Sequence, residues 1–200
     1  MKRRTHGFTL LELMVVLTIA GLLLGIGVPA LGNFIRNARL TAAANDFLAE
    51  LHFARSEAIK RRLPVSVCTS LNPLDETPTC EDSDTLAGWI VFVDHNGDGD
   101  LDAAPEQVLR RHAALPDTIT ARSSSSPLAI TYRDTGFAQD TAGSQLVMCD
   151  ARGNVSSAGA LSAARGIRIA PTGRPEVTRE TGQIDGLLAG ISGAVGGCGG

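Results

Sequence analysis

The stretch Arg3-Arg4-Thr5-His6-Gly7-Phe8-Thr9-Leu10-Leu11-Glu12 decides how this chain is organised, because a short basic leader here meets a long apolar run. No residue from Leu13 to Asn33 is charged, which is 21 positions. At about 1.5 Å per helical residue, that run reaches roughly 30 Å, the thickness of the hydrocarbon core of a bilayer. Glu12 stands at the head of the run. A carboxylate at bilayer depth costs about 2.5–3.5 kcal/mol, so we expect Glu12 to have a partner.

The leader does not follow the pattern of an ordinary secretion signal, in which a short apolar core precedes a small-residue cleavage site. Here Gly7 comes before the apolar run, so a cut after it removes the basic residues and keeps the helix. The segment resembles the class III signal of type IV prepilins. The resemblance implies that a prepilin peptidase cuts between Gly7 and Phe8, and that Phe8 becomes an N-methylated terminus. It also implies that Glu12 meets the terminal amine of a neighbouring subunit. The alternative is a plain signal anchor.

The basic residues Lys2, Arg3 and Arg4 predict the orientation of the chain, since short basic flanks stay on the cytoplasmic side of a membrane. We therefore expect a bacterial inner-membrane protein that crosses the bilayer once. Its N-terminus lies in the cytoplasm, and the part after the helix lies in the periplasm.

The periplasm permits disulfides, and the chain contains four cysteines. Four cysteines allow three pairings, and sequence alone does not choose among them. The short spacing favours Cys68 with Cys80, which leaves Cys149 to tie down the C-terminal segment through Cys198. No Cys-x-x-Cys spacing occurs, so a zinc site has little support.

Charge is unevenly distributed along the chain. Between Leu63 and Leu109 there are ten Asp or Glu residues and no Lys or Arg, whereas arginine is the only strong cation after Ala103. Loss of the leader changes the formal net charge from −3 to −6. A net-acidic protein is not an obvious nucleic-acid binder, because that role depends on neutralising phosphates.

Apolar residues spaced by three and four positions predict that the helix continues beyond the membrane, with one face suited to packing on a sheet. They are Leu40, Ala44, Phe47, Leu51, Ala54 and Ala58. Pro29 is expected to loosen or kink the helix, and Pro64 to end it near Arg62. Short apolar runs between turn residues then predict strands at 65–69, 89–94, 107–111, 119–122, 128–133, 145–150 and 166–170. No long helical pattern separates them, so the sheet should be mainly antiparallel.

The predicted fold class is α+β, with a long N-terminal helix packed on an antiparallel β-rich head. Its parts are the leader 1–7, the transmembrane half of the helix 8–32, the amphipathic half 33–63, the head 64–181 and a glycine-rich tail 182–200. We expect the tail to be flexible unless Cys198 is bridged. The plan resembles the GspH/FimT family of minor pilins and pseudopilins, through residues 33–68, 88–94 and 169–175. The resemblance implies a type IV pilin-like fold.

The resemblance further implies a structural subunit of a type II secretion pseudopilus or a type IV pilus, located near the filament tip. Its partners would be other pilins or pseudopilins, the prepilin peptidase and the inner-membrane assembly platform. An enzyme is not predicted. The histidines have no metal-ligand spacing, and neither a G-x-S-x-G elbow nor a P-loop occurs.

The alternative function is DNA uptake in natural transformation. Some FimT-type relatives bind DNA through Gly-Arg-x-Arg, and this chain has Gly173-Arg174-Pro175-Glu176, with an acid in place of the second arginine. Arg165, Arg168 and Arg179 could still build a local basic strip. The other interpretation is that Gly173 makes a turn and Arg174 pairs with a nearby acid.

An acidic loop at 94–102 suggests a cation site. Its oxygen side chains occur at every second position, as in the first part of a calcium loop: Asp94, Asn96, Asp98, Asp100 and Asp102. The pattern departs from the EF-hand at Pro105, where the last ligand would stand. The other interpretation is a solvated turn between two strands, since Asn-Gly and Asp-Gly are strong turn dipeptides.

The leader analysis predicts the covalent state of the mature protein. Mass spectrometry of the membrane-extracted chain should find a terminus at N-methylated Phe8 that is followed by the intact apolar run. A chain that retains Met1, or one cut after the apolar run, would contradict the prepilin interpretation.

Overall fold

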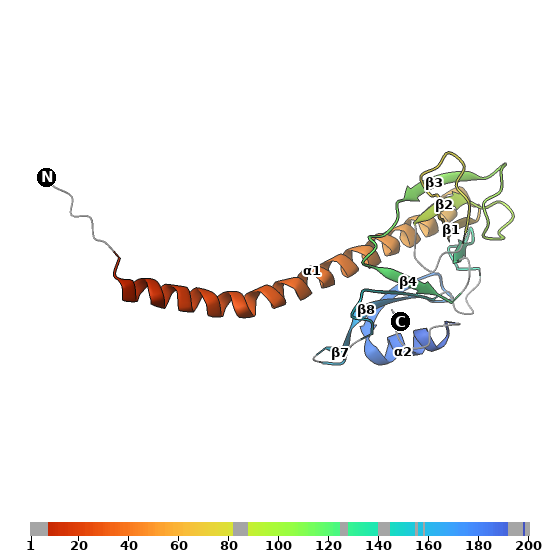
Figure 1. Ribbon diagram of the computed structural model, residues 1–200. Helices are drawn as coiled ribbons and strands as arrows, with labels where there is room; N and C mark the ends of the chain where they lie inside the picture. Colours follow the sequence, from red (N-terminus) through yellow and green to blue (C-terminus); the bar gives the residue numbers. More distant parts are fainter. Residues whose placement is uncertain are drawn as a thin grey trace. The chain divides into compact units, whose positions relative to one another are not determined.

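Figure 1 shows the protein as a computed structural model, which describes residues 8–81, 88–124, 128–139, 145–154, 156–157, 159–191 and 198. The chain forms two compact units, residues 1–38 and residues 39–200. Helix α1, Leu10–Arg61, contributes to both units, and every strand belongs to the second, which we call the head.

The first unit is the N-terminal part of α1. Its apolar side chains are exposed, and an 18-residue window within the helix has a mean hydropathy of 2.4 with no part of it buried. Length and composition therefore allow α1 to cross a membrane. The helix is continuous through position 29, so Pro29 does not end it, and the loosening or kink expected there stays a prediction.

The head contains two antiparallel sheets rather than the single sheet expected from the sequence. The first has the order β3-β2-β1-β5, formed by Gln107–His112, Trp89–Val93, Val65–Thr69 and Ala129–Tyr132. The second has the order β4-β6-β8-β7, with β9 also paired to β8. Its strands are Thr120–Ser123, Gln145–Cys149, Leu161–Ile169, Ser156–Ser157 and Pro175–Glu180.

The head half of α1 packs against both sheets. The six apolar positions of the predicted stripe, from Leu40 to Ala58, are each at most 1% exposed. They share one buried cluster with Val67 and Trp89 of the first sheet and Met148 of the second. Phe47 meets Trp89 edge to face, with ring centroids 5.2 Å apart. The predicted helix face is therefore confirmed, and it forms the centre of the head.

Each sheet also buries its other face. In the first sheet, Ile90 and Phe92 point away from α1 into a smaller cluster with Cys68. In the second, Val147 and Ala164 are covered by α2, Thr181–Ala189. Both β1 and β2 are buried along their whole length, and β2 is a continuous apolar run in the sequence, as expected for a strand covered on both faces. In β1, Ser66 and Thr69 are polar although they are buried.

Three elements were not expected from the sequence. Strands β7 and β9 had no apolar run to indicate them, and α2 lies in the segment expected to be a glycine-rich tail. Strand β8 also begins at Leu161, five residues earlier than predicted. The tail was expected to be flexible unless Cys198 formed a disulfide, and Cys198 is bridged to Cys149.

The stripe predicts the cost of a cavity at its centre. Phe47→Ala should lower the free energy of unfolding of the head by about 3–5 kcal/mol, because a 1%-exposed aromatic ring loses its contact with Trp89. Leu74→Ala, at a 65%-exposed position, is the control and should change stability by less than about 0.5 kcal/mol. Guanidinium unfolding of the detergent-solubilised chain, followed by fluorescence of its single tryptophan, measures both. Equal losses in the two variants would show that the stripe is not the centre of the core.

Candidate functional site

The N-terminal assembly segment begins α1. The Thr9 hydroxyl accepts a hydrogen bond from the backbone N–H of Glu12 at 3.1 Å, so Thr9 caps the helix and Glu12 lies in its first turn. Phe8 is 80% exposed, and Glu12 is exposed too. Gly7, the other residue of the predicted cleavage site, lies outside the described residues. The segment therefore presents an uncovered carboxylate close to Phe8, the terminus that the sequence predicts.

The hydrogen bond between Thr9 and Glu12 orders the start of α1, and it was not predicted from the sequence. Its signal was present, because Thr9-Leu10-Leu11-Glu12 has the Thr-x-x-Glu spacing of a capping box. A carboxylate in the first turn also interacts favourably with the positive end of the helix dipole. Glu12 is thus held on an ordered first turn and not on a frayed end.

The acidic loop is organised around Asp94, which is fully buried. Its carboxylate accepts hydrogen bonds from the backbone N–H of Gly97 at 2.6 Å, from Gly99 at 2.9 Å, and from the Ser66 hydroxyl at 2.6 Å. Both glycines have positive φ, 74° and 82°, which few other residues adopt. Asp94 therefore acts as the internal acceptor that folds the loop.

The other four predicted calcium ligands, Asn96, Asp98, Asp100 and Asp102, are exposed. Two of them accept hydrogen bonds from the side-chain amide of Asn96. Nδ2 of Asn96 donates to Asp98 at 2.8 Å and to Asp102 at 3.1 Å, whereas Asp100 accepts from the backbone N–H of Leu101. Within the described ranges, no group of three or more His, Cys, Asp or Glu side chains is arranged to hold a metal ion. These contacts are those of the turn interpretation, and calcium binding stays a prediction.

The two arginines considered for DNA binding are placed differently. Arg168 on β8 donates to Glu176 on β9 at 3.0 Å, so the acid that replaces the second arginine of the motif pairs with it. Gly173 makes the expected turn, with φ of 76° and its N–H bonded to the Ala170 carbonyl. Arg174 is exposed and forms no ion pair within the described part of the head. The expected pairing of Arg174 with an acid is therefore not found. DNA binding itself stays a prediction.

Arg165, one of the arginines of the expected basic strip, is buried in the head at 2% exposed, so it does not contribute to an exposed strip. Its guanidinium donates to the carbonyls of Ala163 and Ala164 and to the Thr41 hydroxyl on α1 at 3.0 Å. Burial lowers the pKa of Arg165 to about 10, and nearby arginines act in the same direction. Arg165 stays charged at neutral pH and ties β8 to the start of the head half of α1.

The structure contains the disulfide pairing that the sequence spacing favoured, Cys68–Cys80 and Cys149–Cys198. The first closes a short loop beside the outer face of the first sheet. The second holds the C-terminal segment, including α2, against the second sheet. Both bonds agree with folding outside the cytoplasm.

Comparison with known families identifies this combination of apolar helix and two-sheet head. The profile described as Type II transport protein GspH matches residues 43–173, and the profile of the prokaryotic N-terminal methylation motif matches residues 2–28. The chain belongs to the GspH family. It is a subunit of the class of minor pilins and pseudopilins that serve type II secretion or type IV pilus systems, and is structural, not an enzyme.

One relative is similar in sequence and another in structure. The prepilin peptidase-dependent protein D of Escherichia coli (strain K12) is 47% identical over 45 residues, which are 22% of this chain and 31% of that protein's length. The crystal structure of the type IV minor pilin FimU of Pseudomonas aeruginosa has a TM-score of 0.51 with 24% identity. It covers 74% of this chain and 94% of FimU, and shows the shared fold.

The loop geometry predicts that Asp94 stabilises the head. Asp94→Asn should lower the free energy of unfolding by about 1.5–3 kcal/mol, because hydrogen bonds to a buried carboxylate are lost or weakened. Asp100→Asn removes the same charge from an exposed position of the same loop and should have little effect.

The same unfolding measurement, repeated with calcium and with a chelator, tests the loop as a cation site. If the loop is held by its own hydrogen bonds, the wild-type chain melts at one temperature in both solutions. A higher midpoint in calcium that disappears in Asp98→Asn would instead establish the site.

Proposed function

We propose that this GspH-family chain is held in the inner membrane by the first part of α1 and is then assembled into a type II secretion pseudopilus or a type IV pilus. Its processed terminus at Phe8 carries a free amine, and Glu12 pairs with that amine on the neighbouring subunit. The proposed position near the filament tip rests on the family resemblance.

One observation carries the proposal. Glu12 is the single charged side chain between Phe8 and Ile35, on a helix segment whose apolar side chains are exposed. A simple anchor gains nothing from a carboxylate at this depth, because desolvation of the charge opposes insertion. An amine from another copy turns that cost into an attraction, since two opposite charges in a low-dielectric surrounding attract far more strongly than in water.

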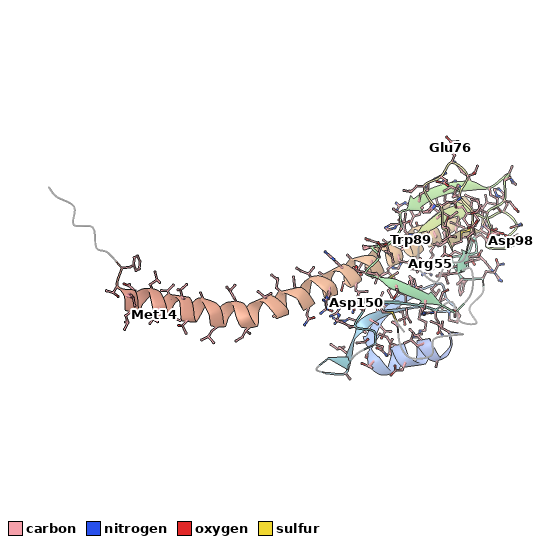
Figure 2. The ribbon with its side chains drawn as sticks, viewed as in Figure 1. Met14, Arg55, Glu76, Trp89, Asp98 and Asp150 are labelled. Atoms are coloured by element: carbon pink, nitrogen blue, oxygen red, sulfur yellow. A yellow bond between two sulfur atoms is a disulfide. The ribbon has the colours of Figure 1, made fainter. Side chains whose placement is uncertain are left out.

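The helix also suits exchange between two apolar surroundings. Its side chains lie uncovered on all sides over the first unit, as Figure 2 shows around Met14. Lipid tails and the apolar helices of other subunits offer similar solvation to such a surface. Transfer from the bilayer to a filament core therefore depends on packing and on polar pairs such as the one proposed for Glu12.

The proposal predicts that assembly depends on the Glu12 carboxylate. Glu12→Ala should be processed to the Phe8 terminus and accumulate in the inner membrane, yet be missing from the sheared filament fraction. Asp46→Ala removes an exposed carboxylate from the head half of the same helix and should assemble normally. Immunoblots of membrane and filament fractions measure both, and normal incorporation of Glu12→Ala would refute the pairing.

Phenotypes of a deletion strain distinguish the type II secretion pseudopilus, the type IV pilus and the alternative of DNA uptake. A clean deletion scored in parallel for protein secretion, twitching motility and transformation assigns the chain to one of them. Loss of secretion alone indicates a pseudopilus, whereas loss of twitching indicates a pilus. Loss of transformation alone indicates DNA uptake.

A further inference from the structure

An exposed patch of apolar and cationic side chains lies on the head where α1 ends. It consists of Arg55, Ile59, Arg133, Phe137 and Arg174, and we call it the α1-end patch. Two hairpin turns build it against the helix. One follows β5, at residues 133–137, and the other joins β8 to β9, at residues 170–174. Figure 2 labels Arg55, one of the two α1 residues of the patch.

Close backbone contacts fix the patch. The Arg55 guanidinium donates to the carbonyl of Thr172 at 3.1 Å, which ties the second turn to the helix. A Cβ at Gly136 would lie 2.7 Å from Cδ1 of Ile59, so the first turn rests directly on that side chain. A Cβ at Gly173 would clash with the Gly136 carbonyl oxygen, so glycine at both positions lets the turns touch.

The side chains on this rigid base are open to solvent. Ile59 is 50% exposed and Phe137 is 52% exposed. Arg133 and Arg174 are exposed, and neither forms an ion pair with another described residue of the head. The two turns contain one carboxylate, Asp134, so the patch carries net positive charge around its apolar centre.

This composition fits a protein partner. A surface that binds the phosphate backbone of a nucleic acid needs cationic side chains. The apolar side chains of Phe137 and Ile59 would contribute nothing to such a contact. An exposed aromatic beside arginines is the composition found at the centres of protein interfaces, where such residues contribute most of the binding energy. The complementary surface must then carry carboxylates.

The chain itself offers such a surface in the acidic loop. Asp98, Asp100 and Asp102 are exposed there, and no Lys or Arg occurs between Leu63 and Leu109 to neutralise them. Among the described residues, no ion pair joins this loop to the α1-end patch of the same head. We propose that the α1-end patch of one copy docks on the acidic loop of a second copy. The inference rests on the proposed function, because subunits of one filament lie side by side.

Cysteine cross-linking between two purified full-length chains tests this contact. The described cysteines are all in disulfides, so a new thiol can be addressed with a bismaleimide. Detergent-solubilised Phe137→Cys chain is mixed with Asp100→Cys chain. The expected yield of mixed dimer is several-fold higher than for Val177→Cys mixed with Asp100→Cys, since Val177 is an exposed apolar residue on β9, outside the patch.

Charge reversal then identifies the interaction. Arg174→Glu in the Phe137→Cys chain should lower the yield several-fold, and Asp98→Arg in the partner chain should restore it. Equal yields for the Phe137 and Val177 positions, or a loss that Asp98→Arg does not restore, would overturn the proposal. The experiment needs neither processing nor the Glu12 contact, so its failure leaves the proposed function standing.

A nucleic-acid role for the patch is a separate outcome. In that case a fluorescent DNA duplex binds the wild-type chain in a salt-dependent way, with binding lost in Arg174→Glu and kept in Phe137→Ala. That result would overturn docking on a second copy, because the exposed arginines of the patch would then serve phosphates rather than the carboxylates of the acidic loop. We expect no such binding, since Arg168 is already paired with Glu176.

Discussion

The contact between the apolar stripe of α1 and the two sheets is the constraint on which the rest of the head depends. Four alanines on this side of α1 are at most 5% exposed: Ala43, Ala44, Ala54 and Ala58. Their small side chains let the strand backbones come close to the helix. Phe47 and Leu51 fill the space between the sheets, where Trp89 and Met148 meet them. One face of α1 thus packs against both sheets. The opposite face of each sheet must then be buried by other parts of the chain.

The covering of those second faces explains several features that otherwise look unrelated. The outer face of the first sheet is closed by a loop fixed through Cys68–Cys80, and that of the second by α2 with Cys149–Cys198. A head of this size has limited apolar area, and disulfides add stability by constraining the unfolded chain. The buried Arg165 and Asp94 play a similar part with hydrogen bonds, each fixing one element to another.

Function divides along the same helix. The head half of α1 has one apolar face and uses it within the chain, whereas the first unit is apolar on all sides and has no use for that surface within the chain. Glu12 is the charged group placed at the open end of this surface. An exposed apolar helix of this kind agrees with membership of the GspH family and with its N-terminal methylation motif.

The sequence by itself determined what depends on neighbours along the chain. The charge-free run, the helix stripe, the strands near 65–69 and 89–94 and the Gly173 turn are all local patterns, and the structure has each of them. Only the tertiary structure decided what depends on distant partners. Strand β9 pairs with β8 although it lacks an apolar run, and α2 forms despite its glycines because the second sheet and a disulfide hold it. The pairing of Arg168 with Glu176 likewise requires two adjacent strands, because a charge has no partner until folding brings one within hydrogen-bond distance.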